Sequence, residues 1–188
     1  MSIASRLMTT EEFLALPDDG VDRELMSGEL RERPMSTRDP DHGFVSGKIA
    51  WALNDWIVRR PQPGGRVYSG DARIRLRRDA ATIVGADLAY LAPEQRGLRP
   101  PGSRLIDGPP TLVVAILSPS DTAEDVAEKR QVYLAAGVAI YWKVDPFDQT
   151  VTVHRPGELP ETFNAAQELT AEPHLPGFRV KVVDLFDE

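Results

Sequence analysis

Helical periodicity marks three segments of the chain. In the two longer ones, apolar residues recur three and four positions apart, which is the spacing of one face of an α-helix. Capping residues indicate where two of these helices begin or end. Thr9 with Glu12 forms a capping box, Ser120 or Asp121 can cap the third helix, and Gly137 can end it. The sequence therefore predicts helices over residues 11–16, 41–60 and 121–136.

Strand periodicity marks the segments between these helices. Apolar and arginine side chains alternate over residues 71–78, as in a half-buried strand. A continuous apolar run over 111–118 is typical of a strand covered on both faces. A stretch rich in Pro and Gly over 93–110 indicates a long loop. The predicted strands are a hairpin over 22–33, strands over 71–78, 82–91 and 111–118, a hairpin over 139–156, and a strand or edge segment over 178–186.

The order of these elements predicts an α/β or α+β fold, with a mixed central β-sheet flanked by helices. The 188 residues suffice for one domain with a sizeable core. We expect residues 1–188 to form a single domain in three parts: a helix and hairpin over 9–34, a core over 41–146, and a hairpin and tail over 147–188.

Composition narrows the class of protein. The chain has 41% apolar and 27% charged residues, as globular proteins do. It has no cysteine, which excludes disulfides, zinc–thiolate sites and thiol nucleophiles. No segment has the apolar length of a membrane span or a signal peptide, which favours a cytoplasmic protein without membrane contact. The net charge of −7 argues against a protein that coats nucleic acid nonspecifically.

One basic segment departs from this acidic balance. Between Arg59 and Arg78 there are seven arginines and one acid, Asp71. The arginines of the predicted strand over 71–78 share its polar face, which is either a nucleic-acid surface or an ordinary solvated face. The candidate contacts to nucleic acid on this strand are Arg73, Arg75 and Arg77.

Hydrolysis of a phosphodiester needs charge stabilisation beside the phosphate. A divalent cation polarises the phosphoryl oxygen and acidifies a bound water, magnesium prefers oxygen ligands, and a lysine can stabilise the developing charge. Asp87 is the best acid for such a site, because an unpaired carboxylate within its apolar strand would be costly. The alternative is an aspartate at an edge or a turn. The next strand offers metal ligands only through backbone carbonyls, for example that of Ile116.

Lys129 shares a helical stripe with Val126 and Tyr133, so it is expected on the face toward the sheet. There it must extend to solvent or find an acidic partner, and pairing with Asp87 would satisfy it. The alternative is an exposed helix face.

Further candidates precede the long helix or open it. Glu24 and Glu29 lie on either side of the first hairpin turn and are either additional acids of the site or ordinary surface glutamates. His42 opens the long helix and is either a phosphate contact or a neighbour of the helix cap.

Five blocks of the sequence together resemble a known family. They read TTEEFLALPDDGVDRELMSGEL, GADLAYL, GPPTLVVAILSPSDT, EKRQVYLAAGV and YWKVDP, and the resemblance covers nearly the whole chain, roughly Thr9 to Phe186. The chain resembles the Uma2-like group of restriction endonucleases in the PD-(D/E)XK nuclease superfamily. The resemblance implies a restriction-endonuclease-like core with a metal site at its centre, Mg²⁺ or Mn²⁺ as cofactor, and DNA as substrate. Two-fold association is common in such nucleases, so a homodimer is also expected.

The resemblance assigns residues to this site. Asp87 matches the metal-binding aspartate, although Ala86 replaces the usual preceding proline. Lys129 matches a lysine on the helix after the third core strand. Glu24 and Glu29 match hairpin acids, one of which is expected to join the metal site, and Glu29 is our candidate for a catalytic role.

The chain departs from the family pattern at Ala115. The pattern V-E-[VI]-L-S-P-S has a carboxylate where this chain reads VVAILSPS. Three hypotheses follow: a metal-dependent DNA endonuclease weakened or inactivated at this position, a nuclease-derived module that only binds nucleic acid, or a protein-interaction partner such as half of a homodimer.

Overall fold

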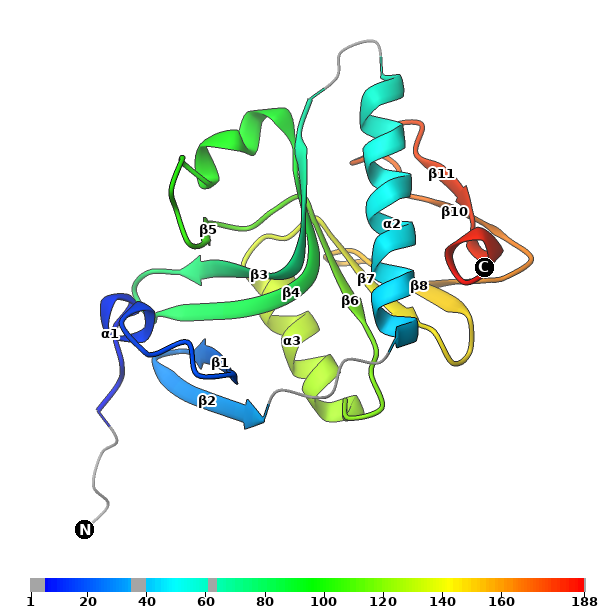
Figure 1. Cartoon of the computed structure of the whole chain (residues 1–188). Helices are drawn as coiled ribbons and strands as arrows, with labels where there is room; N and C mark the ends of the chain where they lie inside the picture. Colours follow the sequence, from blue (N-terminus) through cyan, green and yellow to red (C-terminus); the bar gives the residue numbers. More distant parts are fainter. Residues whose placement is uncertain (1–5, 35–39, 61–63, 188) are drawn as a thin grey trace.

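A mixed nine-stranded sheet forms the centre of the computed structural model, which describes residues 6–34, 40–60 and 64–187 (Figure 1). Its main path has the order β2-β1-β4-β6-β7-β8-β9, and β3 and β5 continue from β4. The strands of this sheet are β1 (Val21–Met26), β2 (Glu29–Pro34), β3 (Arg66–Arg77), β4 (Thr82–Leu91), β5 (Ile106–Asp107), β6 (Leu112–Ile116), β7 (Ile140–Asp145), β8 (Thr150–His154) and β9 (Glu161–Asn164).

Helices cover the two faces of this sheet. A small second sheet pairs two strands near the C-terminus. The remaining elements are α1 (Thr10–Leu14), α2 (Pro40–Arg59), η1 (Pro93–Leu98), α3 (Ala123–Ala135), β10 (Glu168–Thr170), β11 (Arg179–Lys181) and η2 (Val182–Leu185). This arrangement confirms the predicted mixed α/β architecture.

The two long helices pack on opposite faces because each presents one apolar stripe. On α2 the buried stripe includes Val45, Ile49 and Leu53, which join a core with Trp142 and other residues of the central strands. On α3 the fully buried residue is Tyr133, whose ring stacks on Tyr141 with centroids 5.8 Å apart. The central strands are therefore covered on both faces, as their continuous apolar sequences predict.

Most predicted elements are confirmed, including the capping box at Thr9. The cap of α3 was predicted wrongly. Thr122 caps this helix by accepting from the Asp125 backbone N–H, while Asp121 accepts hydrogen bonds from Ser118. The correction has a physical reason, because the aspartate already closes the turn before the helix and is no longer available to cap it.

Sequence periodicity missed several short elements. The expected loop over 93–110 contains η1 and β5, and β5 runs parallel to β3. Strand β3 also begins five residues before the predicted start, and a register shift between Ser69 and Ala72 divides it. The tail contains β9 and β10 as well as the expected segment. Within the described part of the chain, no helix is long and apolar enough to cross a membrane.

Candidate functional site

The candidate site lies where β4 exchanges one neighbour for another. One edge of β4 pairs with β3, while the other edge pairs with β1 at Ile83 and with β6 from Leu88 onward. Gly85 lies between these two pairings. Its N–H donates to Glu24 Oε1 at 3.0 Å, and its carbonyl accepts from the Tyr133 hydroxyl at 2.5 Å. Side chains thus satisfy the backbone groups of Gly85 that the sheet leaves unpaired. We call this place, where β1 and β6 diverge on either side of Gly85, the fork, and the Glu24 carboxylate lies in it.

Glu24 is the buried acid of the fork. It lies on β1, is only 5% exposed, and its Oε1 lies 2.8 Å from Lys129 Nζ on α3. A methyl group in place of the Gly85 hydrogen would lie 3.8 Å from the same oxygen. The carboxylate therefore lies on the face of β4 toward which residue 85 points, and Asp87 points to the same face because side chains alternate along a strand.

Asp87 is held by two donors from other elements. Its Oδ2 accepts from the Ile116 backbone N–H at 2.7 Å, and its Oδ1 accepts from His42 Nε2 at 3.1 Å. The hydrogen bond to Asp87 raises the pKa of His42 above its ordinary value, against the opposing effect of burial. Both carboxylate oxygens are thus engaged by the chain itself.

Position 115 lies beside Asp87 in the sheet. Antiparallel pairing of β4 with β6 joins Leu88 to Val114, so the next step of the register brings Asp87 opposite Ala115. Ala115 in turn pairs with Lys143 on β7. A larger side chain at position 115 would therefore project between the aspartate and this lysine.

The structure places the predicted site residues as follows. Glu24, Asp87, Ala115, Ile116 and Lys129 all lie at or next to the fork. The expected partner of Lys129 was wrong, because Lys129 forms its ion pair with the glutamate of β1 rather than with the aspartate of β4.

Glu29 is not brought to the fork. It begins β2 at the hairpin turn, pairs with Met26 and is exposed to solvent. β2 is the outermost strand of the sheet on this side, so the structure favours Glu24 as the hairpin acid of the site.

The predicted arginine strip is largely engaged in internal contacts. Arg75 forms two hydrogen bonds to the carboxylate of Asp107, and its side chain is only 17% exposed. Arg77 pairs with Asp79. Arg73 lies over the Phe13 ring, with 6.0 Å between the guanidinium carbon and the ring centroid. These contacts reduce the positive charge that the strip presents to a phosphate backbone.

The residues of the fork suit the simpler kind of divalent-cation site. Magnesium commonly takes one or two carboxylates and completes its shell with water and substrate oxygens. Glu24 and Asp87 supply two carboxylates on one face of β4. Across residues 6–34, 40–60 and 64–187, no three His, Cys, Asp or Glu side chains group as a complete metal site. A cation would therefore compete with Lys129 and His42 for carboxylates that the chain already occupies.

Some residues of the site were missed or placed only loosely from the sequence. The stripe that Tyr133 shares with Lys129 was predicted from their spacing, but the hydrogen bond from Tyr133 to the Gly85 carbonyl was not, because it depends on how α3 packs on β4. Lys143 was not singled out, although a lysine within the apolar run of β7 is itself a signal. The sequence leaves two roles open for His42, because its contact with Asp87 depends on how α2 packs.

Comparison with known proteins agrees with this architecture. Residues 10–183 match the Uma2 family, which is described as "Putative restriction endonuclease". A crystal structure described as that of "a putative nuclease" from Anabaena variabilis matches with a TM-score of 0.78 and 22% identity, over 95% of this chain and 97% of that chain. This structural likeness shows a shared fold. No curated protein matches the chain. Because the family match extends over nearly the whole sequence, the chain belongs to the Uma2 family.

Proposed function

We propose that this protein is a metal-dependent DNA endonuclease whose cation site is weakened by the alanine at position 115. The observation that carries the proposal is the fork in the sheet, where Glu24 and Asp87 lie on one face of β4 with Lys129 beside them. Membership of the Uma2 family supports a nuclease and DNA as its substrate.

Each residue of the fork has a separate role in this proposal. Glu24, Asp87 and the Ile116 carbonyl would hold Mg²⁺ or Mn²⁺, which when bound polarises a phosphoryl oxygen and acidifies a water. Lys129 places a positive charge beside this pair of acids, where it can stabilise charge that develops on the phosphate. His42 holds Asp87 in position and contributes a second hydrogen-bond donor on the side of α2.

The alanine weakens this site in two ways. A methyl group at position 115 supplies neither a ligand nor a negative charge, so a cation has fewer and less negative contacts. The neighbouring Lys143 adds positive charge on the same row of the sheet. Loss of several kcal/mol of stabilisation by a catalytic metal corresponds to a rate lower by about 10³-fold or more.

The test is plasmid nicking with Mg²⁺ or Mn²⁺ by this chain and by its Ala115→Glu variant. We expect the glutamate to raise the cutting rate by about 10³-fold, and we expect Ala115→Gln, which has the same shape without the charge, to leave it low. Adding Asp87→Asn to Ala115→Glu should abolish the gain. If the restored acid gives no cutting above that of the glutamine variant, the endonuclease proposal is refuted.

A second candidate function is a nuclease-derived module that binds nucleic acid without cutting it. The observation that favours it is that the chain's own groups already engage both acids of the fork. The arginine strip would then supply phosphate contacts, and replacing Arg73, Arg75 and Arg77 should weaken metal-free DNA binding and reduce its salt dependence. DNA binding that does not respond to salt would contradict this function.

We also propose a homodimer in the cytoplasm. Cutting both strands of a duplex requires two sites in antiparallel relation, which a two-fold dimer provides. Light scattering should give a mass of about twice the 20.8 kDa of one chain. A monomeric mass at micromolar concentration would contradict the dimer without affecting the site itself.

A further inference from the structure

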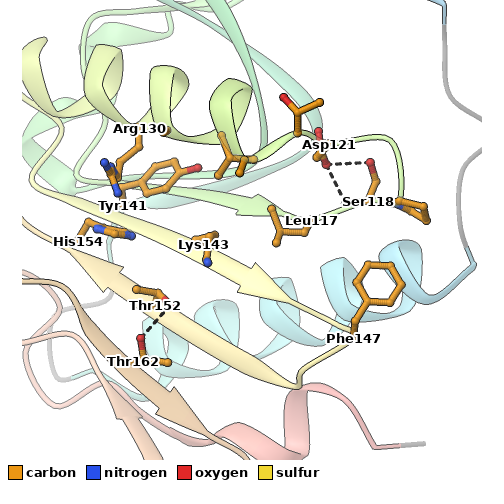
Figure 2. A pocket seen from close by; sticks show the side chains of 15 residues that line it. Leu117, Ser118, Asp121, Arg130, Tyr141, Lys143, Phe147, Thr152, His154 and Thr162 are labelled. Atoms are coloured by element: carbon orange, nitrogen blue, oxygen red, sulfur yellow. Dashed lines mark hydrogen bonds between the residues drawn. The ribbon is translucent and has the colours of Figure 1, made fainter.

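A cavity of about 620 Å³ lies on the face of the sheet that α3 covers, between this helix and strands β7, β8 and β9 (Figure 2). Its floor is formed by the row in which Lys143 pairs with Thr152 and Thr152 pairs with Thr162. The same row continues through Ala115 toward Asp87. The cavity therefore adjoins the proposed cation site and has a different set of lining groups.

The cavity contains two cations without acidic partners. Arg130 on α3 and Lys143 on β7 both line it, and neither forms an ion pair with any acid in the part of the chain that the structure describes. Asp121 also lines the cavity, but its Oδ2 accepts from the Ser118 N–H at 2.7 Å and from the Ser118 hydroxyl at 2.8 Å. This carboxylate closes the turn before α3 instead of neutralising the two cations.

Two buried groups line the same cavity. Tyr141 is only 1% exposed, and its hydroxyl has no hydrogen-bond partner among the described residues. A buried hydroxyl without a partner is costly, so this hydroxyl is a candidate donor to a ligand in the cavity. Burial, and then the charges of Arg130 and Lys143, lower the pKa of His154 to about 4. The imidazole is therefore neutral near pH 7, and the positive charge comes from the arginine and the lysine.

We propose that this cavity binds the phosphate group of a nucleotide. Arg130 and Lys143 supply the charge, and the Tyr141 hydroxyl donates a hydrogen bond to a phosphate oxygen. Phe147 lines the cavity at the end opposite Arg130 and is 63% exposed, so its ring can stack on the base (Figure 2). One bound phosphate would supply the missing partner of both cations and of the hydroxyl.

One part of this inference rests on the proposed function, namely that the bound nucleotide is part of the nucleic-acid substrate. Lys143 is two strands from Asp87, which corresponds to about 10 Å across the sheet. The bound phosphate would therefore differ from the one that is cleaved, and the cavity would position the strand for the fork.

The test is calorimetric titration of the full chain with three probes in EDTA: thymidine 5′-monophosphate, thymidine and inorganic phosphate. We expect saturable binding of the nucleotide, no measurable binding of thymidine, and inorganic phosphate about tenfold weaker than the nucleotide because it lacks a base. No binding of either phosphate compound would overturn the proposal. Equal affinity for the nucleotide and for inorganic phosphate would overturn the assignment to a nucleotide.

Variants then locate the site. Lys143→Met should weaken nucleotide binding by about 10- to 100-fold, and Tyr141→Phe by up to about tenfold. The second substitution keeps the ring and its packing, so it tests the hydroxyl even if the first disturbs folding. Lys181→Met, on exposed strand β11, is the matched control and should bind as the parent chain does. Unchanged affinity in both Lys143→Met and Tyr141→Phe would place binding elsewhere.

Because these titrations contain no metal, they separate the two proposals. A chain that binds the nucleotide but never nicks DNA, even with Ala115→Glu, would retain the phosphate site and lose the endonuclease. A chain that nicks DNA but binds no nucleotide would support the endonuclease proposal and refute the phosphate site.

Discussion

The fork and the cavity lie on the same face of the sheet, and they differ in whether their charged side chains have partners within the chain. At the fork, Glu24 is bound by Lys129, and Asp87 is bound by His42 and a backbone N–H. In the cavity, Arg130 and Lys143 have no acidic partner among the described residues. The two acids of the fork are therefore engaged by the chain itself, while the two cations of the cavity remain available to a ligand.

Ala115 lies between these two regions and accounts for part of their difference. It is opposite Asp87 by the register of β4 with β6, and it pairs with Lys143 on its other side. An acid at this position would both extend the carboxylate group of the fork and neutralise the lysine. A single residue can therefore affect the proposed cation site and the proposed phosphate site in opposite directions, because both share one row of side chains.

The largest effect on stability should come from removing the cation of the fork. Lys129→Met leaves the Glu24 carboxylate buried without its ion-pair partner, so we expect the free energy of unfolding to fall by about 2–3 kcal/mol. Urea unfolding followed by circular dichroism measures this change. The double variant Glu24→Gln with Lys129→Met should recover part of the loss, and Lys181→Met should change it by less than about 0.5 kcal/mol. If Lys129→Met were as stable as the parent, the acid would not depend on this lysine.

A smaller change of opposite sign is expected in the cavity. Tyr141→Phe removes a buried hydroxyl that has no partner among the described residues, so the free energy of unfolding should rise by about 1 kcal/mol in the absence of ligand. The same denaturation experiment measures it, with the solvent-exposed Lys181→Met as reference. A loss of stability would mean that the hydroxyl is already satisfied, and it would remove one support of the phosphate site.

The smallest effect concerns the pH dependence of the contact between His42 and Asp87. The raised pKa of His42 means that its charged form stabilises the folded state. This contribution is complete below the unfolded pKa of about 6.5 and disappears as pH rises through the higher folded value. His42→Gln should therefore cost somewhat under 1 kcal/mol at pH 6 and less at pH 9. A cost that increases with pH would contradict the sign of this coupling.

Sequence patterns predicted the helices and strands of the fold better than they predicted which of these elements contact one another. The periods of α2, β4 and β6 identify the central layers, because each strand or helix encodes its own buried face. Short pieces such as β5 escaped detection, because two residues carry no measurable period.

The candidate site shows the same difference between residues, which the sequence identified, and contacts between them, which it did not. Asp87 and Lys129 were identified from an acid in an apolar strand and a lysine on an inward stripe. That Lys129 pairs with Glu24 was not predictable, because it depends on β1 joining β4 before β6 does. The cavity was not anticipated, because it depends on how α3 packs over β7, β8 and β9, and no sequence period encodes that packing.

The most direct test of the central claim is to locate Mn²⁺ by anomalous scattering in crystals of this chain and of Ala115→Glu. We expect a strong peak between Glu24 and Asp87 in the variant and a weaker peak at the same place in the parent chain. Absence of a peak from both crystals, or Mn²⁺ bound only at other positions, would contradict it.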